Sequence, residues 1–127
     1  MRYLISLMLL VAAAIHLAPL SGVLGGERLT ALYGIGFDEP NLAILMRHRA
    51  VLFGMLGVFL LLAAFMPKLQ VVAIGAGLVS VVSFLWLARS VGGYNAQIAR
   101  VFAADVVALV CLIVGAVALW KVRAAGG

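Results

Sequence analysis

Long apolar runs separated by short polar clusters are the dominant pattern of the chain. No Asp, Glu, Lys or Arg occurs between Arg2 and Glu27, or within residues 50–67, 69–88 and 106–120. With its flanks, each run reaches the roughly 20 residues that a helix needs to cross about 30 Å of hydrocarbon. The period-two alternation typical of membrane β-strands is missing from the sequence. The pattern predicts an all-α, integral membrane bundle of four transmembrane helices, with spans at about 2–20, 42–66, 69–89 and 98–120.

The composition favours a membrane environment over a water-soluble core. Of the 127 residues, 67% are hydrophobic and 10% are charged, whereas a soluble domain averages about a quarter charged residues. A core of this size cannot hide so much apolar surface from water, because small domains leave much of their area exposed. We therefore expect a single transmembrane domain over residues 1–127. The first apolar run is longer than the usual core of a signal peptide and is interpreted as the first span.

The net charge of +5 changes the picture only at the membrane surface. The basic residues are scattered among the spans instead of forming one soluble patch, so we expect membrane lipids as partners and no nucleic acid. A homo-oligomer or a partner in a membrane complex remains open. The single Cys111 lies within the fourth span and cannot form an intramolecular disulfide. We interpret it as a packing residue.

Alternation of the four spans places nearly all polar residues on one side of the membrane. The opposite side carries only four basic residues, Arg2, Lys68, Lys121 and Arg123. The positive-inside rule counts Lys and Arg near span ends, and arginines paired inside the bundle drop out of that count. This favours a multi-pass protein with both termini in the cytoplasm.

The connection between the first two spans, residues 21–41, is long for a helical hairpin. Residues 27–33 are predicted to form a short interfacial segment, which serves as an anchor or as a lid over one mouth of the bundle. Asp38 and Pro40 supply a capping acid and an N-terminal proline, so they predict the start of the second helix.

The second helix carries the basic sequence Arg47-His48-Arg49 about two turns after its predicted start. Arg47 continues into a stripe of mostly small residues at three-four spacing, which includes Ala50, Gly54 and Gly57. Small residues let membrane helices pack closely, so Arg47 is predicted to point along the packing face. His48 and Arg49 lie about 100° and 200° around the helix from Arg47 and are expected to face elsewhere.

Asp105 is the strongest single candidate for a functional residue, because it lies inside the fourth span. A carboxylate facing lipid at that depth costs several kcal/mol, so Asp105 should face the bundle and find a partner on another helix. A buried ion pair that fixes helix register and a ligand-binding acid or base both remain open. The predicted ligand-binding set on this polar side comprises Arg47, His48, Arg49, Asp105, His16, Arg89 and Tyr94.

No motif for a resident cofactor accompanies these residues. The sequence has no Cys-x-x-Cys-His and no helical pair of histidines at i, i+4, so His16 and His48 are not expected to bind haem or a metal. The nucleotide loops and nucleophile elbows of soluble enzymes are likewise missing. The sequence does not decide whether the protein is an enzyme. No cofactor is expected, and a quinone or lipid is considered as a ligand.

Four short spans, an interfacial segment after the first, and an arginine near the start of the second make the chain similar to the small bacterial DoxX-like four-helix membrane proteins. The resemblance implies a helical bundle in the bacterial inner membrane. Some members of that group are tied to quinone-linked sulfur oxidation and others to oxidative-stress complexes. The resulting hypothesis is a protein that binds a quinone, isoprenoid or phospholipid in a polar-lined cavity open on one membrane face. The alternatives are an accessory or assembly subunit and an oligomeric transporter.

Overall fold

The chain is described by a computed structural model, which covers residues 2–18 and 40–126. Everything in this described part is helix or short turn, as the apolar runs predict. The elements are α1 (Arg2–Leu17), α3 (Pro40–Phe65), the 3-10 turn η2 (Pro67–Leu69), α4 (Gln70–Val91) and α5 (Ala96–Ala124). The predicted interfacial segment at 27–33 and the predicted capping acid Asp38 lie outside the described residues.

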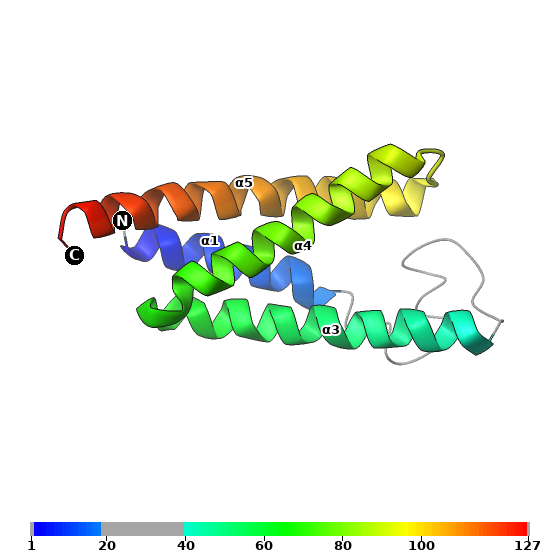
Figure 1. Cartoon of the computed structure of the whole chain (residues 1–127), viewed down its shortest axis with the longest axis horizontal. Coiled ribbons are helices and arrows are strands. Elements are labelled where there is room, and N and C mark those ends of the chain that lie inside the picture. The colour runs from blue at the N-terminus through cyan, green and yellow to red at the C-terminus, as the bar shows by residue number, and fades with distance from the viewer. Residues whose placement is uncertain (1, 19–39, 127) are drawn as a thin grey trace.

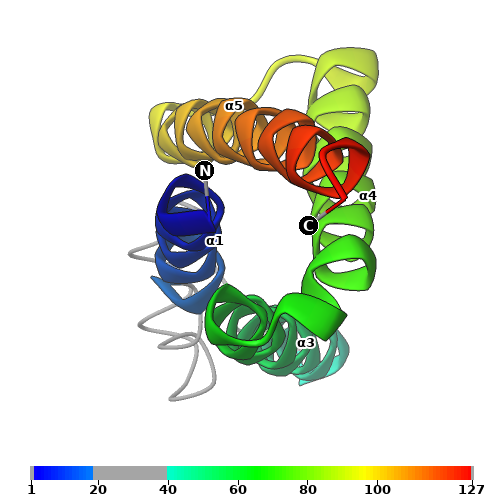
Figure 2. The same cartoon turned by 90° about the vertical axis from the view of Figure 1, so that its left-hand side faces the viewer.

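The four helices form a ring in the order α1, α3, α4, α5 when viewed along the bundle (Figure 2). Helix α1 packs against both α3 and α5, whereas α4 crosses the bundle diagonally from the end of α3 to the start of α5 (Figure 1). The described ends of the chain near Arg2 and Gly126 lie at the same end of the bundle as the turn at Pro67 (Figure 1). We call this end of the bundle the terminal end. The other end, where α3 and α5 begin, is called the opposite end.

Local sequence signals explain where the helices begin and end. Pro40 occupies the first position of α3, where a proline needs no hydrogen-bond partner for its nitrogen. Gly92 and Gly93 both have φ of 67°, a left-handed conformation that ends α4. Asn95 then caps α5, because its side-chain oxygen accepts a 2.8 Å hydrogen bond from the Ile98 N–H.

The predicted spans are correct in position but inexact at their boundaries. Helix α4 continues to Val91 and α5 to Ala124, beyond the predicted limits of 89 and 120. The predicted span boundaries follow the apolar runs. In α5, helical hydrogen bonding continues past the apolar run, because Lys121 and Arg123 are good helix formers and their positive charges are favourable at the C-terminus of a helix. Helix α1 runs to Leu17, and the predicted limit at residue 20 lies outside the described residues.

Small residues and interhelical polar contacts hold α1 against α3. The small side chains of the predicted α3 stripe, including Ala50, Gly54 and Gly57, are buried, which confirms close packing on that face. A Cβ on Gly57 would lie 2.7 Å from Leu17 Cγ, so the two helices approach closely there. Ser6 donates a 2.6 Å hydrogen bond to the Ala64 carbonyl, which ties α1 to the last turn of α3.

Large apolar side chains cover the outside of the bundle as well as its core. Leu9 and Leu60 are fully buried, whereas Val79 and Trp120 are about as exposed as surface residues of a soluble protein. Within the described ranges, three helical segments are long and apolar enough to cross a membrane: α3, η2 together with α4 (Pro67–Val91), and α5. Helix α1 is apolar but shorter, with 16 residues. The outer surface is thus suited to lipid instead of water.

Candidate functional site

Each of the four helices contributes one polar or charged side chain to a connected group in the half of the bundle toward the opposite end. This polar cluster consists of His16 on α1, Arg49 on α3, Ser80 on α4 and Asp105 on α5. Polar and ionisable residues inside a membrane are rare and usually mark a functional site or a structural pair. The polar cluster is therefore the first candidate site of the molecule.

His16 is the most deeply buried member, with 1% of its surface exposed. Its Nδ1 lies 2.8 Å from the Ala12 carbonyl oxygen, and a carbonyl can only accept, so Nδ1 carries the proton. In a neutral ring Nε2 is then an acceptor, and the Ser80 hydroxyl donates to it over 3.4 Å. The ring also stacks on Phe53, with centroids 5.7 Å apart. These contacts fix the imidazole from three sides.

Arg49 is the arginine that reaches into the bundle. Its side chain is half-buried, and its guanidinium carbon lies 4.4 Å from the centre of the Phe53 ring and 5.9 Å from that of Phe84. Contacts of this kind are worth about 0.5–2 kcal/mol, more as water is excluded. Arg49 thereby connects an aromatic wall formed by α3 and α4 to the charge on α5.

Asp105 faces the interior, as its position within the fourth span predicts, with 5% of its surface exposed. The positive charge of Arg49 acts electrostatically on the Asp105 carboxyl. The prediction that Arg47 points inward is wrong, because the Arg47 side chain is exposed. Helix α3 packs so that the face two residues further along the chain, which carries Arg49, turns toward α4 and α5.

The remaining predicted ligand-binding residues lie around the polar cluster instead of in it. His48 is exposed on α3. Arg89 lines a groove of about 460 Å³ between α4 and α5. Tyr94 stacks on Phe102 at a centroid distance of 5.8 Å, and Phe102 lines the same groove. Phe102 also lies three residues before Asp105, so the groove follows the face of α5 that carries the carboxylate.

Ser80 is a member of the polar cluster that is not among the predicted ligand-binding residues, because a serine in a helix can hydrogen-bond to its own backbone. Ser83 does so, donating a 2.9 Å hydrogen bond to the Ser80 carbonyl. Ser80 instead reaches across to His16. Ser80 follows Ala73 and Gly77 at three-four spacing, and both of these small residues are buried, so this spacing is the signal in the sequence that could have identified Ser80.

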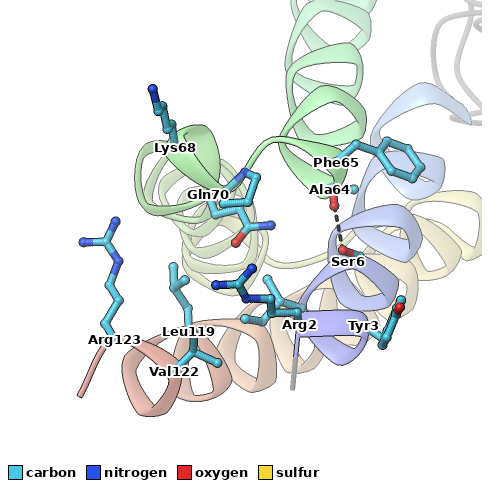
Figure 3. Close-up of a pocket in the computed structure, with 12 residues that line it drawn as sticks. Arg2, Tyr3, Ser6, Ala64, Phe65, Lys68, Gln70, Leu119, Val122 and Arg123 are labelled. Carbon is cyan, nitrogen blue, oxygen red and sulfur yellow. Dashed lines mark hydrogen bonds between the residues drawn. The ribbon is translucent and has the colours of Figure 1, made fainter. Parts of the chain in front are cut away.

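A cavity of about 490 Å³ lies at the terminal end, away from the side on which the sequence predicts a site. All four helices line it, and Figure 3 shows the guanidinium of Arg2 directed toward Gln70 across the opening. Arg2, Lys68 and Arg123 are the basic residues around it. From the sequence, these three residues are predicted to be surface charges, and nothing in the pattern indicates that they surround a cavity.

Within residues 2–18 and 40–126, no three His, Cys, Asp or Glu side chains come together as metal ligands. The polar cluster holds one histidine and one carboxylate, and Cys111 is buried elsewhere in α5. The arrangement in the described part is thus one of hydrogen-bond donors and opposed charges beside aromatic rings.

No family model matches the chain, and the comparisons with curated proteins and with solved structures found no match either. The resemblance to DoxX-like proteins therefore stays a prediction. What the fold defines is an all-helical bundle with three helices in the described part that are long and apolar enough to cross a membrane.

Proposed function

We propose that the chain is a small multi-pass membrane protein, with α1 as a fourth and shorter span, that binds the polar head of a quinone-like amphipathic molecule at the polar cluster. The observation that carries the proposal is the convergence of His16, Arg49, Ser80 and Asp105 from four helices inside an apolar bundle. The bacterial inner membrane, with both termini in the cytoplasm, is the location that the charge pattern and the family resemblance favour.

The chemistry of the polar cluster supports a planar head that accepts hydrogen bonds. Arg49 is a permanent donor whose guanidinium already lies against the Phe53 and Phe84 rings, so a flat ring can stack where the arginine now stacks. Ser80 donates its hydroxyl to His16 Nε2, so it orients the imidazole that stacks on the Phe53 ring. A quinone presents a planar ring with two carbonyl acceptors, which matches these groups better than the tetrahedral, anionic head of a phospholipid.

The groove between α4 and α5 suits the tail of such a molecule. Val82, Leu85 and Trp86 of α4 line it on one side, and Phe102 and Leu109 of α5 line it on the other. These two α5 residues lie within one turn of Asp105 on either side, so the apolar groove and the buried carboxylate share a helix face. An apolar channel next to a few converging polar groups is the usual form of a ligand site.

The two tryptophans provide the test, because Trp86 lines the groove and Trp120 lies near the terminal end. Full-length protein carrying Trp120→Phe keeps Trp86 as its only indole and is titrated with a short-tailed benzoquinone in detergent. We expect saturable quenching of Trp86 emission. The Trp86→Phe protein, which reports from Trp120, should show only the linear quenching that comes from quinone dissolved in the micelle.

Variants then test the residues of the polar cluster. Arg49→Gln and Asp105→Asn are each expected to weaken quinone binding by about tenfold or more, since hydrogen bonds to charged groups are worth about 1.5–3 kcal/mol. Arg100→Gln, an exposed arginine on the same half of α5, is the matched control and should change binding less than twofold. Quenching that is linear for both indoles would contradict the proposal and favour the accessory-subunit alternative.

A further inference from the structure

The cavity at the terminal end is a second feature that the proposed function does not use. It has a volume of about 490 Å³, within the range of about 300–1,000 Å³ that is typical of ligand sites. Its lining combines three basic residues with an apolar wall that includes Ile5, Phe65 and Leu119. A cavity with one charged rim and one apolar wall matches a ligand that is itself amphipathic.

The charge of the rim is entirely positive in the part of the chain that the structure describes. Arg2, Lys68 and Arg123 line the cavity together with uncharged residues. The one acidic residue within the described ranges, Asp105, lies 18 positions before Arg123, which is about 27 Å along α5. Two helix N-termini and two helix C-termini also meet at this end, so their dipoles oppose one another and the side chains set the field.

The three basic side chains at the rim of the cavity point in different directions (Figure 3). Arg2 points across the opening toward Gln70, Arg123 projects away from the α5 ribbon at the other side, and Lys68 points outward. Gln70 is buried and its amide nitrogen donates to the Ala63 carbonyl over 3.1 Å, so the amide is held in place at the cavity. Two guanidinium groups therefore flank one apolar hollow.

We infer that this cavity binds the phosphate-bearing head of an anionic membrane phospholipid, with Arg2 and Arg123 as the phosphate ligands and Lys68 as a rim charge. Arginine binds phosphate through paired N–H groups, whereas Lys acts as a point charge. The ligand is a lipid and not free phosphate, because Ile5, Phe65 and Leu119 continue the site into apolar surface at the level where spans end. This inference is independent of the quinone proposal, which concerns the polar cluster.

The test uses native mass spectrometry of the full-length protein, released from micelles that contain a short-chain phosphatidylglycerol or a phosphatidylcholine with the same chains. We expect phosphatidylglycerol to remain bound and phosphatidylcholine to bind about tenfold more weakly or not at all. An excess of inorganic phosphate should not displace the bound lipid. Equal retention of the two lipids, or displacement by inorganic phosphate, would overturn the inference.

Two charge-removing variants and a matched control identify the site. Arg2→Gln and Arg123→Gln should each weaken retention of phosphatidylglycerol by about tenfold or more. Lys121→Gln removes the same charge two residues from Arg123 but does not line the cavity, and it should change retention less than twofold. An equal loss in Lys121→Gln would show general surface attraction and would refute the site.

Folding and ionic strength supply independent readouts. Circular dichroism checks that each variant keeps its helicity, and Arg2→Lys and Arg123→Lys replace the glutamine variants if either of these unfolds. The lysine variants keep the charge but lose the paired N–H groups, so they should retain the lipid with intermediate strength. In the unmodified protein, added salt should weaken retention, because the rim is exposed to screening. Retention that does not depend on salt would also contradict the inference. Quenching of Trp86 by quinone should be unchanged in all of these variants.

Discussion

A glycine series along the helix contacts provides the most direct test of the packing. Gly57 lies where α3 meets the end of α1, and a Cβ there would lie 2.7 Å from Leu17 Cγ, 2.8 Å from Leu17 Cδ2 and 3.1 Å from the Leu17 backbone nitrogen. Carbon atoms in good contact are about 3.5–4.0 Å apart, so Gly57→Ala leaves the first pair about 0.8 Å too close. Gly75 on α4 has nothing within 4 Å of the same position. The two sites therefore differ in the space around them, since Gly57 is buried between helices and Gly75 is exposed.

The expected magnitudes follow from two opposing effects. Replacing glycine by alanine inside a helix stabilises the helix by about 1 kcal/mol. Overpacking costs about 1–3 kcal/mol. Gly75→Ala should thus raise the free energy of unfolding by about 1 kcal/mol, and Gly57→Ala should leave it unchanged or lower it by up to about 2 kcal/mol. The difference between the two variants, about 1–3 kcal/mol, isolates the close approach of α1 to α3.

Two further glycines have Cβ contacts of intermediate closeness and extend the comparison. A Cβ on Gly77 would lie 3.1 Å from Leu112 Cδ1, the flexible end of a side chain, and one on Gly115 would lie 3.5 Å from Met8 Cβ, which is ordinary contact. Unfolding in mixed micelles of increasing dodecyl sulfate content, followed by circular dichroism, should rank the alanine variants Gly75, Gly115, Gly77 and Gly57 from most to least stable. If Gly57→Ala is as stable as Gly75→Ala, Leu17 moves aside freely and the argument from close approach fails.

Three further outcomes follow from single contacts. Ser6→Ala should lower the free energy of unfolding by about 0.5–1.5 kcal/mol, because it breaks a bond between helices, whereas Ser83→Ala, whose hydroxyl bonds its own helix, should change it by less. Asn95→Ala should cost about 1 kcal/mol through loss of the α5 cap, and Asn95→Asp should restore most of it in the same denaturation assay. Cys111 is buried, so a thiol-reactive maleimide should label the folded protein slowly, and a Cys111→Ala, Ala125→Cys protein quickly. Rapid labelling of Cys111 before denaturation would contradict its burial.

The sequence predicts the helical elements well because uncharged apolar runs of this length strongly favour helices. Apolar runs of span length, Gly92-Gly93 and Asn95 each have one dominant physical consequence, and the structure has helix boundaries within a few residues of those expected. For the first span only the part up to residue 18 can be compared, because the rest of its apolar run lies outside the described residues. Hydropathy reports where apolar residues lie, and it carries little information on where a helix stops within an apolar stretch.

The site was harder to predict because it depends on the rotation of helices about their own axes. A stripe of small residues correctly identified the packing face near Gly57, but extending it by one more turn to Arg47 chose the wrong arginine. Helix α4 crosses the bundle obliquely (Figure 1), so the face of α3 that has neighbours changes along its length. Near the start of α3 the inward position is that of Arg49, next to Phe53 and Phe84. A one-dimensional periodicity contains no information on crossing angles.

Helix α5 relates the two proposed sites, because it contributes Asp105 to one and Arg123 to the other. Their separation of about 27 Å along the axis nearly equals the hydrocarbon thickness of about 30 Å, so in the proposed membrane protein the two sites would lie toward opposite faces. The intervening α5 residues that face inward, including Ala108, Leu112 and Gly115, are apolar or small and well packed. No polar side chain among them relays a charge or a proton between the ends. The quinone-like ligand and the anionic lipid should therefore bind independently.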